Sequence, residues 1–102
     1  MHYSGYPVFN SPESLADNLK EAGFTLVSTA NNHCLDRGEK GVLRTIEHLE
    51  RAGLGFFGTA RSQEERDHFF SVTINGIKVV FLAYTYGTNG IPIPQGKEYL
   101  VK

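Results

Sequence analysis

Four side chains that can bind a metal or transfer a proton fall within six residues, at Asn31, Asn32, His33 and Asp36. An asparagine carbonyl oxygen is a hard ligand of the kind that Mg²⁺ or Mn²⁺ prefers. The imidazole of His33 can bind a metal or transfer a proton near neutral pH. The carboxylate of Asp36 can bind a metal itself, or it can accept a hydrogen bond from the imidazole and so orient the ring. The segment therefore predicts a metal-assisted or acid–base site.

A purely structural interpretation of this segment also stays open. Asparagines that follow a strand often hydrogen-bond their own backbone and shape a turn. Asp36, with Glu39 three residues later, is also typical of a helix N-terminal cap. The spacing alone does not decide between a site and a turn.

Several neighbouring residues are further candidates. Arg37 and Arg61 could contact an anionic substrate, or they are solvated surface residues. Backbone amides near Gly38, at the start of the following helix, favour an anionic group. Thr85 follows an apolar run and could line a crevice or simply pack at a strand end. A nucleophilic role for Cys34 would require a facing base and an electropositive pocket.

Local patterns predict the elements that position these residues. Ser11 is a candidate helix cap, and Gly23 and Gly53 are typical helix ends. Asn75-Gly76 predicts a hairpin turn, because both central positions of a type I′ turn need positive φ. In chain order, we expect a helix over 11–23, a strand over 24–29, a helix over 39–52, a strand over 54–58, a helical turn over 62–66 and strands over 69–74 and 77–84.

This order predicts an α/β fold with a mixed sheet and flanking helices, because strands that alternate with helices form parallel βαβ units. The run 79–83 is apolar on both faces, so we expect a central, covered strand. If the strands that end near Thr29 and Tyr84 are parallel, the loops that follow them rim one crevice. We expect residues 99–101 to pack at the end of the chain.

Composition limits the functions that the chain can have. Its 102 residues suit one small domain, and 40% of them are hydrophobic, enough to fill a core. The net charge of −1 and the lack of interleaved basic and aromatic residues argue against nucleic-acid binding. The single cysteine excludes an intrachain disulfide and a Cys-rich zinc module. We find no apolar run long enough for a membrane span and no signal-peptide pattern.

The segments GFTLVSTANNHCLDRGEKGVLRTIEHLERAGLGFFGTAR and INGIKVVFLAYTYGTN resemble the bacterial capsule-synthesis family CapA, which is associated with poly-γ-glutamate. The resemblance covers about residues 11–90. Residues 1–10 and 91–102 then form loops or tails of a single partial domain over 1–102. The matching positions are Ala30, Asn31, Asn32, His33, Asp36, Gly38, Gly41, Thr45, Leu49, Ala52, Gly53, Asn75–Lys78 and Leu82–Thr85.

This resemblance implies part of an α/β/β/α sandwich similar to that of calcineurin-like metallophosphoesterases, with a di-metal site of Mn, Mg, Zn or Fe at strand ends. By analogy, Asn32 and His33 would bind metal, and His33 and Asp36 would be the catalytic residues. The family implies a γ-glutamyl polyanion or a phosphorylated compound as substrate. The substrate-binding residues that we expect are Asn31, Arg37, Gly38 and Thr85.

The family's Gly-Asp-x-Met strand, acidic segment and His-Pro-His segment have no counterpart here. We therefore expect an interior piece that is inactive by itself, with most of the metal ligands outside it. A non-catalytic assembly component that binds polymer or other capsule-synthesis proteins is the alternative function. A bare scaffold that forms homo-oligomers through exposed sheet edges is a third. The family implies a longer protein that is membrane-anchored or extracellular at the cell envelope.

Overall fold

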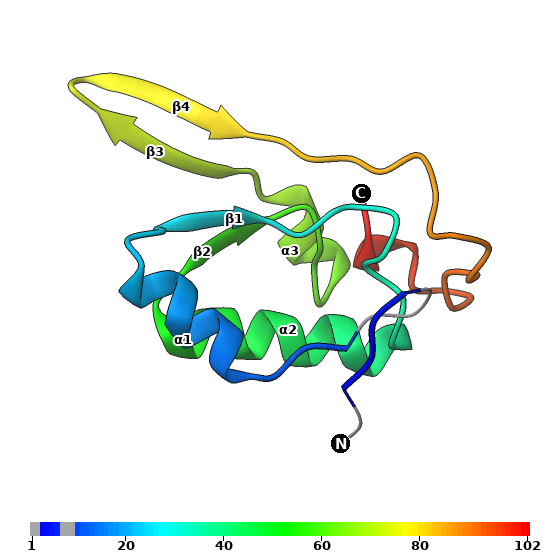
Figure 1. Cartoon of the computed structure of the whole chain (residues 1–102). Helices are drawn as coiled ribbons and strands as arrows, with labels where there is room; N and C mark the ends of the chain where they lie inside the picture. The colour runs from blue at the N-terminus through cyan, green and yellow to red at the C-terminus, as the bar shows by residue number, and fades with distance from the viewer. Residues whose placement is uncertain (1–2, 7–9) are drawn as a thin grey trace.

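The computed structural model describes residues 3–6 and 10–102 of the chain (Figure 1). Within these residues the fold is a small mixed α/β structure with three α-helices and two two-stranded sheets. In chain order the elements are α1 (Ser14–Glu21), β1 (Leu26–Ser28), α2 (Gly38–Ala52), β2 (Gly55–Phe57), α3 (Gln63–Asp67), β3 (Phe70–Ile74), β4 (Ile77–Phe81) and the 3-10 turn η1 (Glu98–Leu100). Of the predicted tail over 1–10, residues 1–2 and 7–9 lie outside the described residues, and Ser4 pairs with Asn10.

Strands β1 and β2 are parallel and are joined by α2, which confirms the predicted βαβ unit. Leu26 pairs with Gly55 and Ser28 pairs with Phe57. Helices α1 and α2 pack against each other on one side of this sheet (Figure 1). The loop after β1 is therefore held between a sheet and the N-terminus of the longest helix.

The helix ends follow the glycine signals, whereas the first helix start does not follow the predicted cap. Gly23 has φ +104° and Gly53 has φ +80°, a region that favours glycine. Helix α1 begins at Ser14 with Glu13 as its N-cap residue and no side-chain cap, so the predicted start at Ser11 is wrong. The Glu13 carboxylate instead accepts a hydrogen bond from Arg44 of α2 at 3.2 Å, which ties the two helices together.

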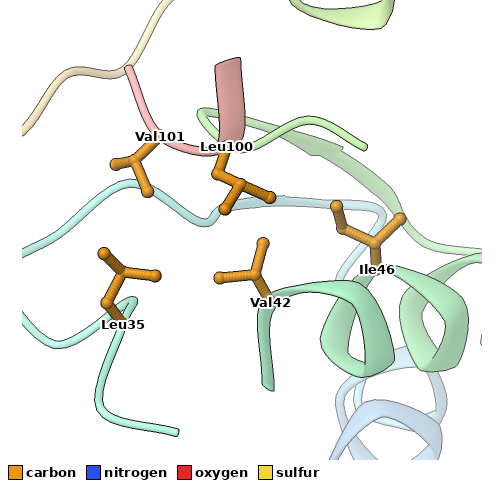
Figure 2. Packing of buried hydrophobic residues seen from close by; sticks show 5 residues of the cluster. All are labelled: Leu35, Val42, Ile46, Leu100 and Val101. Atoms are coloured by element: carbon orange, nitrogen blue, oxygen red, sulfur yellow. The ribbon is translucent and has the colours of Figure 1, made fainter. Parts of the chain in front are cut away.

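The main core lies between α2, the loop before it and the end of the chain. Figure 2 shows Leu100 and Val101 packed over Val42 and Ile46 of α2, with Leu35 beside them. Ile46 and Leu100 have no exposed surface. Full burial of one such side chain stabilises the fold by about 1.5–3 kcal/mol. The predicted packing of residues 99–101 is thus confirmed for Leu100 and Val101.

The structure does not contain the single mixed sheet that the sequence predicts. Strands β3 and β4 form their own antiparallel pair, which projects beyond the β1–β2 sheet (Figure 1). The hairpin turn is confirmed, since Asn75 and Gly76 have φ +51° and +79°. The hairpin contacts the rest of the fold at its base, where the Phe57 and Phe81 ring centroids are 5.5 Å apart.

The prediction of a central, covered strand over 79–83 is also wrong for this structure. Strand β4 ends at Phe81 and pairs only with β3 among the described residues. Val80 is 47% exposed and Leu82 is 53% exposed. An apolar run predicts burial, but only a neighbouring strand or helix can supply it, and the described residues place none there.

None of the described helices is long and apolar enough to cross a membrane.

Candidate functional site

The loop after β1 is shaped by its own side chains and anchored in the core. The Asn31 Oδ1 atom accepts a hydrogen bond from the backbone N–H of His33 at 2.8 Å, the contact of an Asx turn. Two residues later, Leu35 is 1% exposed and packs in the main core. The structural interpretation therefore applies to Asn31, and its role in substrate binding stays a prediction.

His33 and Asp36 form a close pair at the end of this loop. The His33 Nδ1 atom lies 2.7 Å from Asp36 Oδ2, and the Asp36 side chain is 4% exposed whereas that of His33 is 28% exposed. An ionised carboxylate only accepts hydrogen bonds, so it favours the tautomer in which Nδ1 donates and Nε2 carries the lone pair. This arrangement can accept a proton on Nε2 and stabilise the resulting imidazolium.

The capping alternative for Asp36 and Glu39 is wrong. The N-cap residue of α2 is Arg37, and it makes no side-chain cap. Both Glu39 carboxylate oxygens accept hydrogen bonds from Lys97 Nζ at 2.8 Å, and this contact raises the pKa of Lys97. Glu39 therefore holds the loop that contains Lys97 against α2, and its carboxylate does not cap the start of the helix.

A residue that sequence reasoning missed, Asn89, joins the two polar loops. Its Oδ1 atom accepts a hydrogen bond from Asn32 Nδ2 at 3.1 Å, and its Nδ2 atom lies 3.4 Å from His33 Nδ1. The loops after Thr29 and Tyr84 thus meet, although the strands before them belong to different sheets. The available signal was the Asn89-Gly90 dipeptide, a second turn motif like Asn75-Gly76.

An open cavity of about 820 Å³ lies beside this cluster, between α1, β1 and α2. His33, Asp36 and the exposed Arg37 line its end near the loop. Farther along α2, Arg44 and His48 face Glu13 at 3.2 and 3.5 Å. Among the described residues, the cavity cations Arg44 and His48 face Glu13, whereas Arg37 and Lys40 are exposed and in no ion pair there, which suits the predicted contact of Arg37 with an anion.

Two other predicted substrate-binding residues make hydrogen bonds to backbone carbonyls. Gly38 has φ +69°, and its N–H donates to the Leu35 carbonyl at 2.9 Å. The Gly38 amide itself is therefore engaged, and the expectation of free amides near it, which favour an anion, stays a prediction. Thr85 Oγ1 donates to the Gly87 carbonyl, and Thr85 N–H donates to the Lys102 carbonyl, each at 2.9 Å. Neither contact joins Thr85 to the His33 cluster.

The surroundings of two further candidates, Arg61 and Cys34, point to structural roles. Arg61 lies between Glu50 and Glu65, with 2.6 Å from its Nη2 to Glu65 Oε2, and hydrogen bonds to both carboxylates raise the pKa of its guanidinium. Burial raises the pKa of the Cys34 thiol. A thiol held protonated at neutral pH is a poor nucleophile, so the structure favours a packing role for Cys34.

The described residues do not by themselves complete a metal site. Across residues 3–6 and 10–102, no group of three or more His, Cys, Asp or Glu is placed to hold a metal ion. The nearby donors are the Asn32 amide oxygen and the His33 imidazole, and Mg²⁺ or Ca²⁺ takes about six or more ligands. The donors that the described residues place at this loop thus do not fit a metal without further ligands.

The chain is similar to bacterial proteins of capsule synthesis. A family model described as "Bacterial capsule synthesis protein PGA_cap" matches residues 1–100. The "Capsule biosynthesis protein CapA" of Bacillus anthracis is 33% identical over 76 residues, which cover 74% of this chain and 18% of that protein. The "PGA biosynthesis protein CapA" of Bacillus subtilis (strain 168) is 29% identical over 68 residues, 66% of this chain and 18% of that protein.

A third relative comes from a different class of protein. The "DNA double-strand break repair protein Mre11" of Methanopyrus kandleri (strain AV19) is 35% identical over 68 residues, 67% of this chain and 15% of that protein. No solved structure matches the chain significantly. The chain spans less than a fifth of the length of the curated relatives that it matches.

Proposed function

The chain belongs to the bacterial capsule synthesis protein family PGA_cap, and from this premise we propose that it forms part of a CapA-like protein of poly-γ-glutamate capsule biosynthesis. The longer protein would be a metal-dependent hydrolase or transferase that acts on γ-glutamyl or phosphoester bonds at the cell envelope. The similarity to an Mre11 protein agrees with the metallophosphoesterase resemblance of the Asn-Asn-His motif. The two small sheets would then be parts of one partial sandwich domain.

The observation that carries this proposal is the His33–Asp36 pair at the end of an open cavity. With Nδ1–H donated to Asp36, the Nε2 atom of His33 would take a proton from an attacking group or return it to a leaving group. A positioned general acid or base accelerates a reaction about 10²–10⁴-fold. Asp36 would hold the ring and stabilise its protonated form.

Substrate recognition would depend on Arg37. Its exposed guanidinium lines the same cavity and suits a carboxylate or phosphate oxygen, which Arg binds with paired donors. The assignments of Asn31, Gly38 and Thr85 to substrate stay predictions, because their hydrogen bonds shape the loops. An anionic polymer and other capsule-synthesis proteins would be the partners.

Tight metal binding is proposed for the longer protein, whereas this chain alone would bind Mn²⁺ weakly through Asn32 and His33. Asn32 and His33 would supply two donors, and the remaining ligands would come from residues outside this chain. Because Asp36 engages Nδ1 of His33, the ring has only Nε2 left, which can either bind a metal or move a proton, but not both at once.

Calorimetric titration of poly-γ-glutamate into the chain tests this function, with Mn²⁺ and then with EDTA. We expect binding that Mn²⁺ strengthens, that Arg37→Ala weakens and that the Asn32→Ala/His33→Ala double variant loses. His68→Ala is the matched control, because His68 is exposed beside α3 and lines a different cavity. Binding that survives EDTA and the double variant would instead favour a non-catalytic polymer-binding component. No binding under either condition would contradict the proposed substrate.

A further inference from the structure

We propose that Asn89 is a positioning residue, whose side-chain amide fixes the orientation of the Asn32 amide. The Oδ1 atom of Asn89 accepts a hydrogen bond from Asn32 Nδ2 at 3.1 Å, although the two residues are 57 positions apart. Because Nδ2 of Asn32 is directed to Asn89, Oδ1 of Asn32 is the end of that amide available to another partner.

The second end of the Asn89 amide faces His33. Its Nδ2 atom lies 3.4 Å from His33 Nδ1, while Asp36 Oδ2 lies 2.7 Å from the same nitrogen. The shorter contact decides the tautomer, so Asp36 accepts the Nδ1 proton, and Asn89 Nδ2, itself a donor, lies beside the ring without a hydrogen bond to it. One amide therefore contacts both residues to which the proposed function assigns chemistry.

The backbone around Asn89 holds its side chain in place. Asn89 and Gly90 have φ +56° and +79°, and Ile91 N–H donates to the Thr88 carbonyl at 3.1 Å. This is the pattern of a type I′ turn, which Asn-Gly favours. Thr88 Oγ1 also donates to the Ile91 carbonyl, which closes the turn a second time. Asn89 is thus presented from a constrained turn.

The consequence for a ligand rests on the proposed function. A divalent cation needs the oxygen of Asn32, and an Asn32 amide turned by 180° would offer an NH₂ group instead. An anionic ligand would prefer the opposite orientation. The Asn89 contact therefore favours a cation or a hydrogen-bond donor at Asn32.

Two substitutions test whether the side-chain oxygen of Asn89 is what holds the Asn32 amide. Asn89→Asp keeps an oxygen that can accept from Asn32 Nδ2, whereas Asn89→Gly removes it and still tolerates the positive φ. Asn75→Gly makes the same change in the distant hairpin turn, where Asn75 has φ +51°. It is the matched control.

The readout is the side-chain amide signal of Asn32 in ¹H–¹⁵N NMR spectra of the ligand-free chain. We expect Asn89→Gly to shift this signal and to speed its hydrogen exchange several-fold, whereas Asn89→Asp and Asn75→Gly retain slow exchange. Unchanged exchange in Asn89→Gly, or equal loss in Asn89→Asp, would overturn the proposal. If Asn89→Gly does not fold, Asn32→Ala must shift the Asn89 amide signal, and no shift there would also overturn it.

Metal binding is measured separately, so that the two proposals fail independently. If Mn²⁺ does not bind, the proposed metal-donor role of Asn32 and His33 in this chain fails, while the Asn32 amide signal still reports the Asn89 contact. If Mn²⁺ binds, we expect Asn89→Gly to weaken the affinity by more than Asn89→Asp.

Discussion

Replacing Gly58 with alanine should destabilise the fold at the base of the candidate site. Gly58 is buried and has φ +117°, which L residues rarely adopt. A Cβ atom there would lie 2.6 Å from the Ala30 backbone nitrogen and 2.7 Å from the Ala30 Cβ. Ala30 directly precedes the Asn31–Asp36 loop, so the clash would displace that loop.

The magnitude of the loss has two parts. A residue held in a sparsely populated φ/ψ region costs about 1–3 kcal/mol. Overpacking against a backbone that cannot move away costs about 1–3 kcal/mol more. Gly76→Ala is the matched control, because Gly76 has φ +79° and nothing within 4 Å of its Cβ position. Its expected cost is only the backbone cost, about 1–2 kcal/mol.

Urea denaturation followed by circular dichroism gives both free energies of unfolding. We expect Gly58→Ala to lose about 2 kcal/mol more than Gly76→Ala, roughly 8–16 °C in Tm for a domain of this size. Backbone NMR signals of residues 30–36 should shift in Gly58→Ala and not in Gly76→Ala. Equal losses in the two variants would refute the close approach of the β1 and β2 ends.

Three further predictions follow from single features. Gly38→Val should lower Tm more than Arg37→Ala, because φ +69° strains a β-branched residue; equal melting temperatures would contradict this. Because burial raises the pKa of Cys34, iodoacetamide alkylation at pH 8 should be slower in the folded than in the denatured chain. The free energy of unfolding should fall as pH rises above the ordinary thiol pKa, because the denatured chain then ionises at Cys34 before the folded chain does. Ile77→Lys should reduce self-association in sedimentation, since Ile77 is 66% exposed on β4, whose outer edge pairs with no other described strand; unchanged association would show that the hairpin is not the contact.

Features set by neighbouring residues were predictable from the sequence. Gly23, Gly53 and the Asn75-Gly76 turn adopt positive φ where their local patterns predict it. The apolar face of α2 is buried at Val42 and Ile46, because helical periodicity alone defines the face of a helix that packs inward.

Features set by distant residues were not predictable. The separation into two sheets depends on how the hairpin base meets the β1–β2 sheet, and strand propensity carries no information on that contact. The Asn31–Asp36 loop was recognised as a candidate site from its residue types. Its partner Asn89 was missed, because a hydrogen bond across 57 residues leaves no trace in local spacing.

The central claim is that Asn32 and His33 form the ligand-facing part of this chain. Adding substoichiometric Mn²⁺ to the labelled chain tests it directly, since the paramagnetic ion broadens NMR signals near its binding position even when binding is weak. We expect selective broadening of the Asn32 and His33 side-chain signals, lost in the Asn32→Ala/His33→Ala double variant. No broadening there, or broadening only at the acidic residues of α3, would contradict the claim.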